Sequence, residues 1–418
     1  MWIAVVLCAL GAERVAANEL KKLKLRVLDS GFGRVRFEAD LAGLYRALMG
    51  LRTADRILLE AARFEARDFE ELFEGSRGVP WEELIPRGKG LKVSKVRSNR
   101  SRLEAVTSIQ GVVHKAAADR LCASYGLRRL PEEGDEAELR VYLEKDQVSL
   151  LLDLCGEPLF KRGYRSEGGA APLRETTAAA LLLLSGWKRK FPLYDPFCGS
   201  GTIPLEGAIY AWDMAPGIGR SFALSGLSLA DRALERVIRE ELLAKVNFEN
   251  TIRIYGSDAD SRAVSQAKSN LVRAYELARG KNPQKGIRTG TPEGEFPGKN
   301  GGTSPLPDFR LIPLVKARSP DSEGFIITNP PYGKRVYPSV ISMGDHPAGI
   351  HPSPEGRRQA AEAIYREMGV LAKNFPGWKL GIITDHPGFE SHFGRKADSL
   401  REITNGAIPS YFYEYHHL

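Results

Sequence analysis

The chain has 418 residues, of which 43% are hydrophobic and 27% charged, so it has the composition of a globular protein with two or three domains. Its net charge of +8 favours a polyanionic partner. The four cysteines include no C-x-x-C pair and the seven histidines show no metal-ligand spacing. A zinc site and a disulfide framework are therefore not expected, and the reducing cytoplasm is the expected compartment.

The first 65 residues alternate strands and helices. Residues 2–10 are apolar but lack a basic flank and are too short to span a bilayer, so they predict a buried first strand rather than a signal peptide. A helix over residues 13–23, strands over 25–28 and 34–37, a helix capped by Asp40 and a strand over 56–59 follow. This order predicts a small α+β domain over residues 1–65.

Residues 66–156 predict a second α/β domain, with a helix over 112–125 and a hairpin of 139–143 with 149–153. Its segment 86–102 carries seven cations and no acidic residue: Arg87, Lys89, Lys92, Lys95, Arg97, Arg100 and Arg102. Cations without counter-charges gain free energy when they neutralise phosphates, which favours a polyanionic partner that carries phosphates. The alternative is an edge strand whose lysines only prevent pairing with another chain.

Residues 157–191 form a polar, Gly-rich linker followed by a helix over 173–184, on which Thr176 or Thr177 could contact a ligand. From residue 192 onward strands alternate with helices, which predicts a parallel, doubly wound sheet over residues 192–418. Two segments of low regularity, 279–307 and 336–358, are expected to be surface loops inserted in this domain.

A glycine turn follows the strand at 193–195. Gly199 and Gly201 allow the backbone to approach a ligand, and the amides at the following helix start favour a carboxylate or phosphate. Pro204 replaces the third glycine of G-x-G-x-x-G, which disfavours a dinucleotide. Asp195 could bind an ammonium group. The remaining candidate residues of the turn are Phe197, Ser200 and Thr202.

Asp258 ends the next strand, where an acid commonly accepts hydrogen bonds from ribose hydroxyls. An inserted helical element over residues 215–250 explains its long separation from the glycine turn, and Asp260 is expected to cap the following helix. A site for an amino acid moiety beside a site for a ribose predicts S-adenosylmethionine as the cofactor.

The apolar strand 325–328 runs into Asn329, Pro330, Pro331 and Tyr332. Two prolines force the chain out of the sheet at its carboxyl edge, where α/β sheets bind ligands. The Asn329 amide oxygen and the Pro330 carbonyl could accept both hydrogens of an exocyclic amino group while Tyr332 stacks on the base. The alternative is a rigid turn with a packed tyrosine.

The order of these motifs resembles the THUMP-containing RNA guanine-N2 methyltransferases over essentially the whole chain. The matching segments are KRGYR at 161–165, APLRET at 171–176, DPFCGSGT at 195–202, MAPG at 214–217, NPPYG at 329–333 and FGRKAD at 393–398. The resemblance implies a ferredoxin-like domain over 1–65, a THUMP RNA-binding domain over 66–156, a linker with a cofactor-site helix over 157–191, and a Rossmann-like class I methyltransferase domain over 192–418. Lys316 departs from the family, which has an acid at this position that contacts the adenine amino group.

The resemblance further implies that a guanine amino group in 23S ribosomal RNA, or in tRNA, is the methyl acceptor. The residues themselves do not distinguish guanine from adenine, because the same acceptors serve a DNA adenine methyltransferase. A third alternative, a non-catalytic RNA-binding assembly factor, rests on Lys316 alone.

Overall fold

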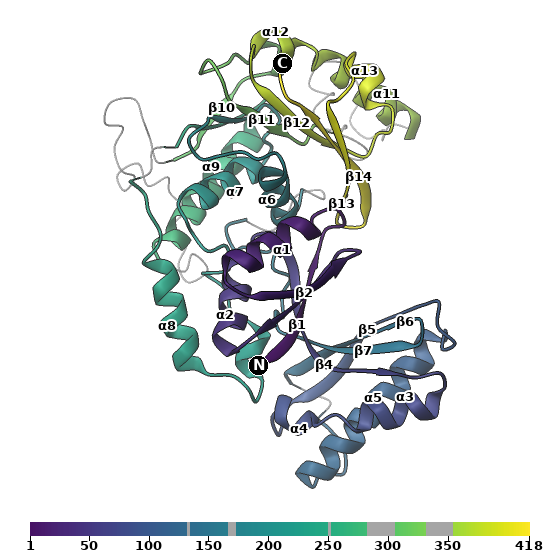
Figure 1. Cartoon of the computed structure of the whole chain (residues 1–418). Helices are drawn as coiled ribbons and strands as arrows, with labels where there is room; N and C mark the ends of the chain where they lie inside the picture. The colour runs from purple at the N-terminus through teal and green to yellow at the C-terminus, as the bar shows by residue number, and fades with distance from the viewer. Residues whose placement is uncertain (132–133, 166–172, 250–251, 282–305, 332–353) are drawn as a thin grey trace. The chain divides into compact units, whose positions relative to one another are not determined.

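The computed structural model describes residues 1–131, 134–165, 173–249, 252–281, 306–331 and 354–418 (Figure 1). It divides into two compact units. The first unit contains residues 1–8, 16–159 and 220–240, and the second contains residues 9–15, 160–219 and 241–418. Each unit is built around one seven-stranded sheet.

The sheet of the first unit has the strand order β2-β3-β1-β4-β7-β6-β5. Its strands are β1 (Trp2–Cys8), β2 (Arg26–Gly31), β3 (Arg34–Ala39), β4 (Ala54–Glu65), β5 (Gly90–Asn99), β6 (Glu136–Glu144) and β7 (Gln147–Asp153). The long β4 pairs antiparallel with both β1 and β7, so one continuous sheet extends across the predicted boundary at residue 65. The predicted first strand and the predicted hairpin are both confirmed.

Helices cover one face of this sheet. They are α1 (Glu13–Lys22), α2 (Leu41–Gly50), α3 (Phe69–Arg77), α4 (Trp81–Leu84) and α5 (Val106–Tyr125), of which α5 packs on β5 and α3 on β4 (Figure 1). A sheet covered on one face requires side chains that alternate between buried and more exposed, and β3 shows this alternation. Val35 and Phe37 are fully buried, whereas Arg34 and Arg36 are half-buried. The Asp40 side chain accepts a hydrogen bond from the Gly43 amide, which confirms the predicted helix cap.

The sheet of the second unit has the order β10-β9-β8-β11-β12-β14-β13. Its strands are β8 (Leu193–Asp195), β9 (Ile254–Asp258), β10 (Asp308–Leu311), β11 (Phe325–Thr328), β12 (Lys379–Thr384), β13 (Ser399–Asn405) and β14 (Ile408–Tyr415). The first five strands in this order are parallel, and the last two are antiparallel. Successive strands spread outward in both directions from β8, so the topological switch point lies between β8 and β11, where such sheets bind ligands.

Two helical layers cover the second sheet (Figure 1). The helices α6 (Glu175–Leu184), α7 (Thr202–Ala211) and α9 (Ser261–Ala278) pack together on β8 to β10. The helices α11 (Pro354–Glu367), α12 (Val370–Asn374) and α13 (Phe389–Phe393) form a core with Tyr194, Ile326 and Leu380 from the strands. This confirms the predicted doubly wound architecture.

The connecting segments agree with the predictions in part. The helical element expected within residues 215–250 is present as η1 (Ala223–Gly226) and α8 (Arg232–Leu243). Most of the two predicted insertions lies outside the described residues. The end of the second one is not a loop, because α11 begins at Pro354 and residues 354–358 form its first turn.

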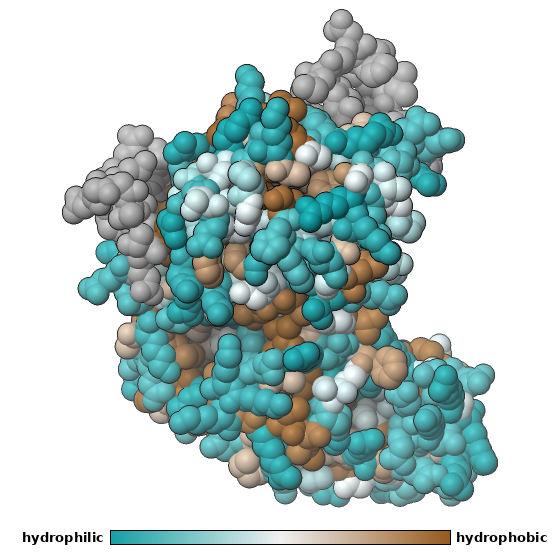
Figure 2. Space-filling view, turned by 45° about the horizontal axis from the view of Figure 1, so that its top comes forward, coloured by the Kyte–Doolittle hydropathy of each residue, from teal (hydrophilic) through white to brown (hydrophobic). Residues whose placement is uncertain are grey.

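Hydrophilic residues cover much of the face in Figure 2, with hydrophobic residues interspersed among them. Within the described part of the chain, the structure has no helix that is both long and apolar enough to cross a membrane. All four cysteines are free thiols.

Candidate active site

Asp195 and Thr328 meet at the switch point of the second sheet. Asp195 ends β8 and Thr328 ends the neighbouring parallel strand β11. The Thr328 hydroxyl donates a hydrogen bond of 2.6 Å to Asp195 Oδ1, and the Phe197 amide donates one of 3.0 Å to the same oxygen. Both side chains are buried, with Asp195 only 2% exposed.

Burial is the main cause that raises the pKa of Asp195 to about 7. The two hydrogen bonds lower this pKa, whereas the nearby Asp258 raises it. A carboxyl group with this pKa is half protonated at neutral pH. A bound cation would favour its ionised form, so Asp195 is suited to an ammonium group on a ligand.

The glycine turn leaves space beside this acid. Gly199 has φ +52°, and a Cβ atom added to it would meet no atom within 4 Å. Gly201 has φ +86°, and a Cβ atom there would lie 2.9 Å from Phe309 Cζ. Only glycine adopts either of these positive φ angles easily. A side chain at Gly201 would also clash with Phe309, whereas Gly199 borders open space that a ligand could fill. Among the described residues, no side chain caps α7, which begins at Thr202.

Asp258 joins the glycine turn to β9. Its carboxylate accepts hydrogen bonds of 2.9 Å from the amides of Gly199 and Asp260. Burial raises the pKa of Asp258, while the bonds from these amides lower it. Each carboxylate oxygen has a further lone pair, so the group can still accept from ribose hydroxyls. Asp260 caps α9 as predicted, accepting from the Arg262 amide.

Asn329 follows Thr328 directly. Its Oδ1 atom is buried and has no hydrogen-bond partner among the described residues. Pro330 is buried and Pro331 half-buried, and Tyr332 lies outside the described residues. A buried acceptor without a partner is unusual and requires an explanation, and an amino group on a bound base would satisfy it.

A buried polar network ties the linker to helices α6 and α7. The Arg165 guanidinium donates to the Thr202 hydroxyl and lies 3.3 Å from Glu175 Oε1. Burial raises the pKa of Glu175 to about 7, while Arg165 lowers it. Arg165 therefore links α6, which carries the buried Thr176, to the first residue of α7.

A second pair of contacts extends this network. The Tyr164 hydroxyl donates to Glu206 Oε1 at 3.1 Å, and Arg162 Nε lies 3.5 Å from the same oxygen. Sequence reasoning assigned no role to these residues. Two signals were available: the matching segment KRGYR at 161–165, and Glu206, a single charged residue within helix α7.

Glu362, His386 and His392 also come together, which their sequence separation did not predict. The Nε2 atoms of His386 and His392 lie 3.4 and 3.5 Å from Glu362 Oε1. The Gly388 amide donates to His386 Nδ1 at 3.1 Å, so the proton of a neutral His386 ring is on Nε2 and faces the carboxylate. This arrangement suits a polar contact between α11 and the segment that follows β12 better than metal ligation by His386.

The other predicted site residues have these positions. Phe197 packs against the core of the second sheet, and the Ser200 carbonyl accepts from Asn270 Nδ2 at 3.0 Å. Lys316 is exposed at the end of η3 (Leu314–Lys316), which follows β10.

The cations of the segment 86–102 differ in exposure. Lys89 is only 8% exposed, and its ammonium group binds the Asp135 carboxylate. The other six are exposed on the surface: Arg87, Lys92, Lys95, Arg97, Arg100 and Arg102.

A Rossmann-like sheet with an acid at the end of its first strand, a glycine turn, a second acid on the next strand and Asn-Pro-Pro after the fourth defines a class I methyltransferase domain. A family profile described as "RMKL-like, methyltransferase domain" matches residues 162–279. A second profile, "RlmL ferredoxin-like domain", matches residues 4–58.

The putative RNA methyltransferase YpsC of Bacillus subtilis (strain 168) is 33% identical over 410 residues, which are 97% of this chain and 94% of that protein. The chain therefore belongs to the RMKL-like methyltransferase family. The ribosomal RNA large subunit methyltransferase K/L of Cellvibrio japonicus (strain Ueda107) is 32% identical over 420 residues, which cover 96% of this chain but only 49% of that longer protein.

Two solved structures are similar over the whole chain. SMU.472, a putative methyltransferase complexed with SAH, has a TM-score of 0.80 and 32% identity, with 100% of this chain and 98% of that chain covered. A predicted N6-adenine-specific DNA methylase from Listeria monocytogenes str. 4b F2365 has a TM-score of 0.81 and 31% identity, with 100% and 96% covered.

Proposed function

We propose that this protein transfers a methyl group from S-adenosylmethionine to the exocyclic N2 amino group of a guanine in RNA, and that the RNA is 23S ribosomal RNA. The observation that carries the proposal is the Oδ1 atom of Asn329 at the switch point of the sheet, which is buried and has no hydrogen-bond partner among the residues that the structure describes. The names of the two relatives, one an RNA methyltransferase and one acting on the large ribosomal subunit, support RNA as the substrate.

The described residues fit the cofactor. Asp195 would hold its ammonium group, the turn from Gly199 to Thr202 its carboxylate, and Asp258 its ribose hydroxyls. Thr176 on the neighbouring helix α6 completes the proposed set. When bound, S-adenosylmethionine supplies an electrophilic methyl group on a sulfonium. The residues of this chain therefore need mainly to align the amine with that group.

Asn329 and Pro330 perform this alignment. The amide oxygen of Asn329 and the carbonyl of Pro330 accept the two hydrogens of the guanine amino group. Two acceptors on these hydrogens localise the nitrogen lone pair, which is otherwise delocalised into the ring, and fix its direction. No strong base is required, because the amino group loses its proton during or after transfer. Tyr332 takes the base-stacking role that the family resemblance implies.

The target guanine must be unpaired or flipped to reach a pocket at the edge of a sheet. Residues 66–156 serve as the THUMP domain that binds the surrounding RNA. Their exposed cations support this role, because six of the seven in the segment 86–102 are available to phosphates.

The variant Asn329→Ala tests the proposal. We expect turnover on unmodified 23S ribosomal RNA to fall by about 10²–10³-fold or more, because one positioned hydrogen-bond partner in the transition state is removed. Binding of S-adenosylhomocysteine and of RNA should stay near the wild-type values, which equilibrium dialysis and filter binding would show. Near-normal turnover of this variant would contradict the assignment.

A DNA adenine methyltransferase is the second candidate, because an adenine amino group would satisfy the same acceptors and one structural neighbour bears that name. The names of the two relatives favour RNA, and incorporation of labelled methyl groups into RNA or DNA decides between the two candidates. A tRNA guanine would use the same pocket, and mass-spectrometric mapping of modified guanosines in cells lacking the protein would locate the target. An assembly factor without cofactor affinity, suggested by Lys316, would not bind S-adenosylmethionine.

A further inference from the structure

Five cations from four strands lie on the same face of the first sheet, opposite the face covered by α3 and α5. The strand registers pair Lys95 with Arg140 and Arg97 with Tyr142, and alternation along β4 and β3 puts Arg56 and Arg34 on this face as well. These five cations, Arg34, Arg56, Lys95, Arg97 and Arg140, are called the cationic face below.

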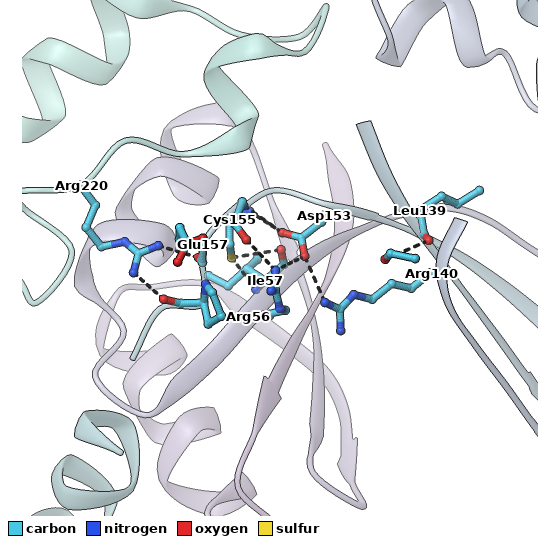
Figure 3. A network of polar contacts seen from close by, with 11 residues as sticks. Arg56, Ile57, Leu139, Arg140, Asp153, Cys155, Glu157 and Arg220 are labelled. Atoms are coloured by element: carbon cyan, nitrogen blue, oxygen red, sulfur yellow. Dashed lines mark hydrogen bonds and ion pairs between the residues drawn. The ribbon is translucent and has the colours of Figure 1, made fainter. Parts of the chain in front are cut away.

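Three of the five cations of the cationic face share two acids, because Glu144 Oε2 lies 3.5 Å from Arg34 Nη2 and Asp153 pairs with two arginines. Asp153, which is buried, accepts from Arg56 Nη1 at 2.5 Å and lies 3.5 Å from Arg140 Nη2, so one carboxylate serves two guanidinium groups (Figure 3). Arg140 is itself only 9% exposed, and its Nε atom has no partner among the described residues. Burial lowers the pKa of Lys95, and the charges of Arg97, Arg140 and Arg56 lower it further.

At the border of the cationic face, positive charge is balanced by acids. Arg36, on the same face of β3, is neutralised by Glu60 and Asp29, each 2.7 Å from its guanidinium. The unbalanced positive charge is therefore local. It lies over β4, β6 and β5 rather than over the whole sheet.

The sheet curves so that this face is concave. Arg34 on β3 lies over the Tyr142 ring on β6, with Cζ 5.3 Å from the ring centroid. These strands are four positions apart in the sheet, which in a flat sheet would separate them by about 19 Å. Arg97 lies 6.0 Å from the same centroid, so Tyr142 holds two guanidinium groups from opposite parts of the sheet.

We propose that the cationic face binds the phosphate backbone of the RNA substrate, with Tyr142 positioning Arg34 and Arg97 for this contact. The inference rests on the proposed function and deepens it. It adds Arg34, Arg56 and Arg140 from three other strands to the segment 86–102, and it omits Lys89. Guanidinium groups bind phosphate oxygens through two parallel hydrogen bonds, and a curved surface brings several of them to one strand of RNA.

The double variant Lys95→Ala/Arg97→Ala, in the full chain, tests the proposal. Its affinity for unmodified 23S ribosomal RNA is measured by filter binding from 0.05 to about 0.3 M salt. Loss of two phosphate contacts should reduce the slope of log K against log salt by about 1.4–1.8 and weaken binding about 20-fold at 0.15 M salt. The matched control is Arg77→Ala/Lys115→Ala, which removes the same charge from exposed positions on α3 and α5 and should leave the slope near the wild-type value.

Arg34 lies outside the segment 86–102, so Arg34→Gln tests the residues that the inference adds to that segment. This variant should reduce the slope of log K against log salt by about 0.7–0.9. Tyr142→Phe, which keeps the ring, should bind as the wild type does, whereas Tyr142→Leu should weaken binding. Thermal melting and binding of S-adenosylhomocysteine show that each variant is folded.

Three outcomes overturn the inference. If the wild type methylates RNA but the Lys95/Arg97 and Arg34 variants keep its slope, the cationic face is not the docking surface and the proposed function stands. If the control Arg77→Ala/Lys115→Ala reduces the slope of log K against log salt by the same amount, RNA binding depends on the net charge of the chain and not on the cationic face. If the wild type binds no RNA, both the inference and the RNA assignment fail.

Discussion

Replacing Thr328 by valine removes one hydrogen bond from Asp195 without changing the size of the side chain. Thr328 is fully buried, and its hydroxyl donates to Asp195 Oδ1 at 2.6 Å. This bond favours the ionised carboxylate, so its loss raises the pKa of Asp195 above its present value of about 7. Because the ammonium group of the cofactor requires an ionised partner, we expect weaker cofactor binding at neutral pH.

The size of the effect follows from the hydrogen bond. A hydrogen bond to a charged group is worth about 1.5–3 kcal/mol, which corresponds to a pKa rise of about 1–2 units. At pH 7 the wild-type carboxyl is half ionised, but in Thr328→Val the ionised fraction would be roughly one tenth to one hundredth. Affinity should therefore fall about 5- to 50-fold at pH 7. At pH 9 the carboxyl is at least half ionised in both proteins, so the difference should shrink to about twofold or less.

Isothermal titration with S-adenosylhomocysteine from pH 6 to 9 measures this difference. The comparison is the ratio of dissociation constants between variant and wild type, in which the titration of the ligand itself cancels. Thr328→Ser keeps the hydroxyl and should follow the wild-type curve. A ratio that stays constant from pH 6 to 9 would refute the reasoning, because the valine would then act by a change of shape rather than through the ionisation of Asp195.

Further predictions concern the glycine turn, Lys89 and the pH dependence of stability. Gly199→Ala should cost only about 1 kcal/mol of stability, since its Cβ meets nothing within 4 Å, yet lose tenfold or more in affinity for S-adenosylhomocysteine. Gly201→Ala should cost about 2–4 kcal/mol in urea unfolding, because its Cβ would lie 2.9 Å from Phe309 Cζ. Lys89→Met should leave the salt dependence of RNA binding unchanged. Burial raises the pKa values of Asp195 and Glu175 to about 7, so at intermediate pH the folded chain holds protons that the unfolded chain releases. The melting temperature of the ligand-free protein should therefore fall by several degrees from pH 5 to 8. This fall should be smaller in Asp195→Asn.

Local patterns were sufficient to predict the strands of the first sheet and β8, β9 and β11 of the second, but not the antiparallel strands β13 and β14. The alternation around Val35 and Phe37 and the cap at Asp40 depend only on neighbouring residues, and the structure confirms both. The continuous sheet of the first unit was not predicted, because it depends on the long-range pairing of β4 with β1 and β7. That pairing includes a register shift between Glu60 and Ala62, which no local pattern indicates.

The candidate site could be predicted further than the proposed docking surface. Asp195, Gly199, Gly201, Asp258 and Asn329 each end or follow a strand, and the rule that parallel strands share a carboxyl edge predicts that they come together. No comparable rule predicts which charged side chains will lie next to a given cation. The burial of Lys89 against Asp135, and the meeting of Lys95 with Arg140, depend on which strands become neighbours and are visible only in the fold.

The end of β11 connects the two halves of the reaction. Thr328 bonds the acid proposed to hold the ammonium group of the cofactor, and the next residue, Asn329, carries the acceptor proposed for the amine. Consecutive residues are separated by only about 3.3 Å along a strand, and the two prolines that follow restrict how the chain leaves the sheet. In the proposed site, one short strand end thus sets both the electrostatics around the methyl donor and the position of the nucleophile. Methyl transfer depends on the alignment of these two groups, which explains why the motif places them at adjacent positions rather than on separate loops.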